Sequence, residues 1–165
     1  MTTYNVSIRL INFVEFQMYL LLKWLHVLSA IFAVGANATY VVWLRLADQE
    51  KGAKPFALKG IMRLENVALP FYLFLLLSGL VMIFVSGIPW TTPWVLSSLI
   101  LYFAMAFLGG KVFGSALRKQ IELADKPQSA AYLAAEKYGI RVGLLILLIA
   151  VVIEYLMTTK PPLWG

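Results

Sequence analysis

The chain contains a single histidine, His26, and no cysteine. Disulfides, thiolate metal sites and thiol chemistry are therefore excluded. A neutral imidazole in a helical bundle is a ligand for haem iron or another metal, so His26 is the candidate metal ligand. The alternative is that His26 only forms a hydrogen bond to a neighbouring helix. One histidine cannot make a bis-histidine haem site within a monomer, so ligation needs Met82, Met105, a second copy of the chain or an open sixth position.

His26 belongs to a stripe of polar and small residues that recurs at helical spacing. The stripe consists of His26, Ser29, Ala30, Ala33, Asn37 and Tyr40. Small and polar residues mark helix–helix contacts in membranes, so we expect this face to point into a bundle. The same reasoning directs further small and polar residues inward: Ser78, Gly79, Met82, Ser98, Tyr102, Met105 and Gly109.

Four apolar segments must position these residues, at about 18–44, 67–85, 94–113 and 140–157. Hydrophobic residues make up 61% of the chain and charged residues only 13%, whereas soluble domains carry about 25% charged residues. A helix needs roughly 20 apolar residues to cross about 30 Å of hydrocarbon. Backbone polar groups inside a bilayer must be satisfied locally, so the segments must be helices. The sequence predicts an all-α, polytopic four-transmembrane-helix bundle that forms one membrane domain over residues 1–165.

The basic residues indicate which side each loop faces. The connections after the first and third apolar segments hold 11 of the 14 lysines and arginines, and the connection at 86–93 holds none. Basic residues are retained in the cytoplasm, so we expect both termini and the 86–93 loop to be extracytoplasmic. The +6 net charge is explained by these two loops and predicts no nucleic-acid partner, because a nucleic-acid face needs its charges gathered together.

With this orientation, a polar cluster lies in the outer half of the bundle. Its members are Lys23, His26, Met82, Ser98, Tyr102 and Glu154. We predict that His26 faces the interior beside Met82, Ser98 and Tyr102, which would line a cofactor site. We also predict a structural polar cluster of Lys23, Asn37 and Glu154, in which Glu154 pairs with Lys23 or with His26. Ionisable groups at membrane depth usually face the bundle interior or a cavity.

Three motifs resemble an uncharacterised family of small bacterial four-helix integral membrane proteins. They are the run 22–30 (LKWLHVLSA) with Gly35 after it, Thr91-Thr92-Pro93-Trp94, and Lys160-Pro161. The resemblance covers nearly all of the chain after about residue 18. It implies the four-helix architecture and a bacterial cytoplasmic membrane location, and it brings no established activity.

More distantly, the layout is similar to haem-associated membrane protoporphyrinogen oxidases and to copper-resistance D-type proteins. The oxidases share a Lys-x-x-His setting in the first span, matched by Lys23 and His26. They also carry a lysine early in the third span, where this chain has Ser97 and Ser98 after Trp94. The resemblance therefore implies haem or tetrapyrrole binding near His26 rather than the oxidase reaction.

Two classes of function follow from the sequence. In the first, the protein binds haem b or a tetrapyrrole through His26. In the second, it is a non-catalytic accessory or assembly subunit whose polar residues only join the helices. Neither class assigns a catalytic residue, and both place the chain in a lipid bilayer as a homo-oligomer or as part of a larger membrane complex. A transporter is a poorer choice, because transporters usually have internal repeats.

Overall fold

The computed structural model describes residues 2–164, with side chains from Phe16 onward. Over this range the regular structure is helical and contains no strand. The helices are α1 (Thr2–Ala38), α2 (Tyr40–Gln49), α3 (Lys54–Val85), α4 (Pro93–Phe107), η1 (Leu108–Phe113), α5 (Gly114–Glu122) and α6 (Ala130–Thr159). The element η1 is a π-helix that joins α4 to α5 without a loop.

Four helical stretches are long and apolar enough to cross a membrane. They are Phe16–Gln49, Lys54–Val85, Pro93–Glu122 and Ala130–Thr159, so the predicted all-α architecture with four spans is confirmed. Each stretch is longer than the apolar segment found in the sequence, because the helices continue past it, by several residues at one end and by two or fewer at the other. Pro55 and Pro93 lie in the first turns of α3 and α4, where a missing backbone N–H costs nothing.

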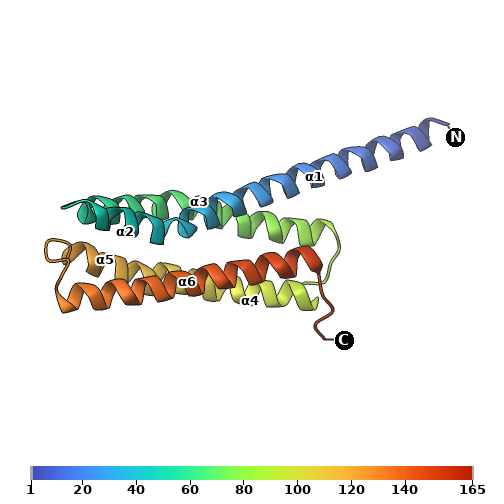
Figure 1. Cartoon of the computed structure of the whole chain (residues 1–165). Helices are drawn as coiled ribbons and strands as arrows, with labels where there is room; N and C mark the ends of the chain where they lie inside the picture. The colour runs from blue at the N-terminus through green and yellow to red at the C-terminus, as the bar shows by residue number, and fades with distance from the viewer. Residues whose placement is uncertain (1, 165) are drawn as a thin grey trace.

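The helices form two layers, with α1, α2 and α3 in one and α4, α5 and α6 in the other (Figure 1). Within the layers, α1 packs along α3, and α4 with η1 packs along α6. The turns at 50–53 and 123–129 lie at one end of the bundle, which we call the basic end. The 86–92 loop and the C-terminus lie at the other, the terminal end (Figure 1).

The buried core lies mainly toward the basic end. Its fully buried large side chains include Leu58, Leu117 and Tyr132. Large apolar side chains on the outer faces are exposed, among them Ile31 at 62% and Phe84 at 88%. Such exposure fits contact with lipid rather than water. The tight packing at one end leaves the space between the layers open toward the other.

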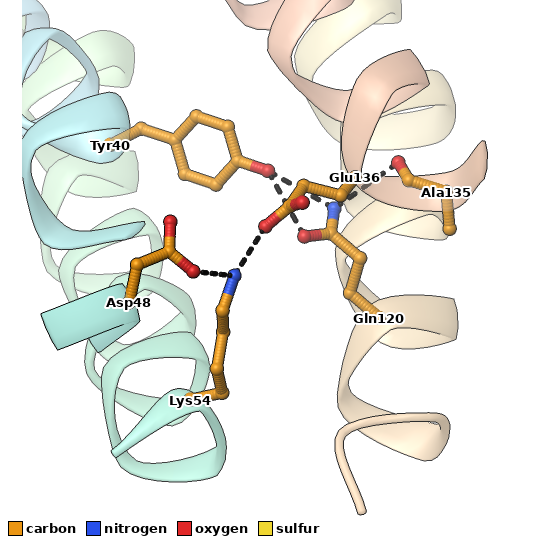
Figure 2. Close-up of polar contacts among 6 residues, drawn as sticks. All are labelled: Tyr40, Asp48, Lys54, Gln120, Ala135 and Glu136. Carbon is orange, nitrogen blue, oxygen red and sulfur yellow. Dashed lines mark hydrogen bonds and ion pairs between the residues drawn. The ribbon is translucent and has the colours of Figure 1, made fainter. Parts of the chain in front are cut away.

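A polar network joins the two layers at the basic end (Figure 2). Lys54 Nζ lies 2.7 Å from Asp48 Oδ1 and 2.7 Å from Glu136 Oε1. Beside this ion pair, Gln120 Nε2 donates to the Tyr40 hydroxyl at 3.0 Å. Because Lys54 and Tyr40 belong to one layer and Glu136 and Gln120 to the other, the network fixes the layers to each other at this end.

Candidate functional site

A cavity of about 370 Å³ lies between the layers toward the terminal end. Ligand and cofactor pockets occupy about 300–1,000 Å³, so the volume is at the lower end of that range. Four predicted site residues line it, His26 from α1, Met82 from α3, and Ser98 and Tyr102 from α4. The structure therefore brings these four residues to one space, although they come from three helices.

The ring of His26 is held by one hydrogen bond to α3. Its Nδ1 lies 2.8 Å from the Ser78 hydroxyl oxygen. That hydroxyl is 2.6 Å from the carbonyl oxygen of Phe74 and donates its proton there. With this proton assigned to Phe74, Ser78 accepts from His26, which assigns the proton of the neutral ring to Nδ1 and leaves Nε2 its lone pair. Among the described side chains, Ser78 is the hydrogen-bond partner of the ring.

Gly79 allows this close approach of α1 and α3. A Cβ atom at Gly79 would lie 3.1 Å from Cε1 of His26, closer than ordinary van der Waals contact. The ring is thus confined between the Gly79 backbone and the Ser78 hydroxyl. Small residues at such interfaces let membrane helices approach closely.

Ser98 supplies an unpaired polar group in the opposite wall of the cavity. Its side chain is 1% exposed, and its hydroxyl has no hydrogen-bond partner in the described structure. Tyr102, one turn further along α4, donates its hydroxyl proton to the carbonyl oxygen of Tyr72 at 2.9 Å. A buried hydroxyl without a partner costs free energy, so Ser98 provides a hydrogen bond that a bound molecule can complete.

Two lysines flank the cavity near its terminal end. Lys23 and Lys160 both line it and are exposed. Lys160 ends α6 in a left-handed conformation with φ of 48°. Its Nζ lies 5.4 Å from the centre of the Trp94 ring, a cation–π distance. An acidic group on a molecule in the cavity would therefore meet positive charge at this end.

The predicted structural cluster of Lys23, Asn37 and Glu154 is not assembled. Glu154 lines the cavity but accepts its hydrogen bond from Thr158, at 3.2 Å on its own helix. In the part of the chain with described side chains, no ion pair or hydrogen bond joins Glu154 to Lys23 or His26. Glu154 nevertheless lines the same cavity as Lys23 and His26, so their pairing stays a prediction.

Asn37 lies in a different part of the bundle. Asn37 follows His26 by eleven residues, which corresponds to about 16 Å along the axis of a helix. The Asn37 side chain contacts Tyr72 and Glu65 and lines a second cavity of about 360 Å³ toward the basic end. The rise along α1 therefore separates Asn37 from Lys23 and Glu154.

Comparison with protein families identifies the chain. The family described as predicted integral membrane proteins, DUF2269, matches residues 20–161. The chain belongs to this family. No curated protein and no solved structure matches it.

Membership of DUF2269 makes the protein an integral membrane protein, and the match covers His26, Met82, Ser98, Tyr102, Glu154 and Lys160. Over the described side chains, no group of three or more His, Asp or Glu residues gathers as a metal site. His26 would thus be a single protein ligand. A porphyrin brings four nitrogens of its own and takes its axial ligands from the protein, which suits one histidine with a free Nε2.

Sequence reasoning missed the residues that close the basic end. Lys54, Gln120 and Glu136 lie outside the four predicted spans, as does Glu65, and none was proposed as a site residue. Charged and amide side chains between spans usually lie in water, so the residue type alone does not predict that they contact another helix. Tyr40 was the one member of the network on the inward stripe.

Proposed function

We propose that this DUF2269 protein binds haem b, or a closely similar tetrapyrrole, in the cavity at the terminal end, with Nε2 of His26 as the axial ligand. The observation that carries the proposal is the 2.8 Å contact between His26 Nδ1 and Ser78. Metal-ligating histidines almost always donate their other ring N–H to a fixed acceptor, which sets the tautomer and raises ligand basicity. His26 has this arrangement and faces a cavity that Met82 and Met105 also line.

Two lysines at the rim and one hydroxyl in the other wall support the proposal. Lys23 and Lys160 would meet its two propionate carboxylates, and charge-assisted contacts of this kind are the stronger class of hydrogen bond. The unpaired Ser98 hydroxyl would donate to a polar group inside the cavity. A bound haem supplies one-electron or small-gas chemistry, and the protein sets access and polarity around it.

We further propose that the protein lies in the bacterial cytoplasmic membrane with both termini outside. The basic end carries most of the lysines and arginines, in its two turns and in the helices beside them, and such basic segments are retained in the cytoplasm. The His26 cavity would then open toward the outer side. This orientation suits a cofactor protein that exchanges electrons or a ligand with the extracytoplasmic space.

The accessory-subunit function makes a different use of the same contact. If His26 and Ser78 only join α1 to α3, the hydrogen bond is the whole role of the imidazole. His26→Asn separates the two functions. Its amide keeps a hydrogen-bond donor near the Nδ1 position, so the contact with Ser78 can persist, but it has no equivalent of Nε2 and cannot ligate haem iron. His26→Ala removes both groups.

The test is the absorption spectrum of the protein purified in mild detergent from haem-replete cells. We expect a Soret band in the wild type and in Ser97→Ala, a control in the same turn of α4 as Ser98. His26→Asn and His26→Ala should both accumulate in the membrane without the band, and added imidazole should restore it to His26→Ala. A colourless wild-type protein would overturn haem binding and favour the accessory subunit. A band retained by both variants would remove His26 as the ligand.

A further inference from the structure

The second cavity, of about 360 Å³, lies between α3 and the α4–η1–α5 helix toward the basic end. Tyr102 and Met105 line both cavities and so mark the boundary between them. The second cavity contains neither His26 nor Ser98 and has its own charged groups, Glu65 and Arg118. It is a separate space with a different chemistry.

This cavity opens sideways from the bundle. Lining residues on both of its walls are exposed, Leu69 at 67% and Leu73 at 57% on α3, with Ala106 and Gly110 across from them. In a bilayer, exposed apolar faces of this kind contact acyl chains. A molecule can therefore enter from the lipid without passing through the polar network at the basic end.

In the wall formed by α4, η1 and α5, small residues occur at every fourth position, and the next position in this series is an arginine. They are Ala106, Gly110 and Gly114, followed by Arg118. A Cβ atom at Gly110 would meet nothing within 4 Å, so the glycine leaves open space. Gly110 also lies in the π-helix η1, and π-helical turns frequently occur at functional sites. The row of small residues provides room for a chain that leads to the Arg118 guanidinium.

Glu65 faces the same cavity from the other layer without a cationic partner. No ion pair joins it to Arg118 or to another basic residue within the described residues. With the Asn37 amide turned, its Nδ2 donates to the Glu65 carboxylate, at 3.2 Å to Oε2, and its oxygen accepts from the Tyr72 hydroxyl in place of the bond from that hydroxyl to the Ala33 carbonyl. The amide orients the carboxyl group, which has no cationic partner among the described residues.

From this geometry we infer that the cavity binds a phospholipid with a primary ammonium head group, of the phosphatidylethanolamine class. The phosphate contacts Arg118, whose planar guanidinium suits phosphate geometry. The ammonium contacts Glu65, and one acyl chain follows the groove beside Ala106 and Gly110. A carboxylate accepts hydrogen bonds from the three N–H groups of an ethanolamine ammonium, whereas a choline head group offers none. The inference is independent of haem binding at the other cavity.

The experiment measures lipid retention by native mass spectrometry. The full-length protein is exchanged into micelles holding equal amounts of phosphatidylethanolamine, phosphatidylcholine and phosphatidylglycerol with identical acyl chains. We expect one lipid to remain bound and the ethanolamine lipid to exceed the choline lipid by about tenfold, the effect of a charge-assisted hydrogen bond. Equal retention of the three lipids, a preference for phosphatidylglycerol, or no retained lipid would overturn the inference.

Variants assign the two contacts and the groove. Glu65→Gln should abolish the preference for ethanolamine over choline while total lipid retention persists. Arg118→Gln should lower retention of both lipids, and Gly110→Leu should do so by filling the groove. Gly35→Leu is the matched control, because Gly35 also has nothing within 4 Å of an added Cβ and lines neither cavity. An unchanged preference in Glu65→Gln would show that Glu65 does not contact the ammonium.

Discussion

Ser78 determines what the ring of His26 can do. By donating to the carbonyl of Phe74 and accepting from Nδ1, it fixes the neutral imidazole in the tautomer that leaves Nε2 free. The sequence predicted that both residues face inward, because each lies on a polar stripe at helical spacing. It could not identify them as partners, since that depends on the register between α1 and α3, which the Gly79 contact with the ring sets.

Removal of the Ser78 hydroxyl should weaken haem binding without removing the ligand. In Ser78→Ala, Nδ1 loses its acceptor and the ring is free to rotate or to change tautomer. Loss of such a partner typically costs 10–100-fold in metal affinity, and we expect haem affinity to fall by about this factor. Titration of the apoprotein with haem measures it. Ser115→Ala is the control, because the Ser115 hydroxyl donates to the carbonyl oxygen of Val112, three residues earlier in the chain, at 2.8 Å. Equal haem affinities in the two variants would contradict the role of Ser78.

At the scale of the elements, the sequence predicted the helices better than their ends and contacts. The four predicted spans are confirmed as helical stretches, but the helices continue past the apolar segments at the basic end, where α3 begins at Lys54 and α6 at Ala130. The third segment was expected to be one regular helix, but it contains the π-helix η1. Gly109 was predicted only to face the bundle interior, because an apolar pattern does not distinguish an α-helical turn from a π-helical one.

The extensions at the basic end matter because they carry the network between the layers. Gly139 of α6 lies against this network. A Cβ atom there would lie 2.7 Å from Gln120 Nε2 and 2.9 Å from the Tyr40 hydroxyl. Both neighbouring groups are buried, so neither moves into water to make room. The position of Gly139 is therefore a packing requirement that a pattern of small residues alone does not reveal.

Gly139→Ala should destabilise the protein by separating the layers at the basic end. Loss of buried hydrogen bonds costs about 1–3 kcal/mol per unsatisfied group, which exceeds the gain of about 0.5–1 kcal/mol from replacing a helical glycine by alanine. Gly60→Ala provides the matched control, because an added Cβ there meets nothing within 4 Å, and it should be neutral or slightly stabilising. Thermal unfolding in detergent compares the two. A Gly139→Ala protein as stable as wild type would show that Gln120 and Tyr40 can move aside without loss of stability.

For the whole molecule, the layers are joined by a polar network at the basic end, and one cavity lies on each side of the Tyr102–Met105 boundary. The Lys54 ion pairs and the Tyr40–Gln120 contact join the layers at the basic end, whereas the cavity beside His26 separates them toward the terminal end. The composition predicted this four-helix architecture in full, because length and hydropathy determine membrane spans. The positions of the cavities could not be predicted, since they depend on which opposing side chains fail to fill the space between the layers.

The orientation of this asymmetric molecule determines what each cavity meets. The chain has no cysteine, so single cysteines introduced at exposed loop positions report the side of the membrane directly. We expect Thr91→Cys, at the terminal end, to react with a membrane-impermeant maleimide in intact cells. Glu50→Cys and Asp125→Cys, at the basic end, should react only after permeabilisation. The reason is electrostatic: 11 of the 14 basic residues lie in or beside the two connections at the basic end, and such loops stay in the cytoplasm.

The reverse labelling pattern would place the basic end outside. The His26 cavity would then open to the cytoplasm, and the Glu65–Arg118 cavity would meet the outer leaflet. The contacts of His26 with Ser78 and the charges of Glu65 and Arg118 would be unchanged, so both binding inferences would stand with their compartments exchanged. Labelling therefore tests the orientation alone, and the Soret and lipid measurements test the two cavities independently of it.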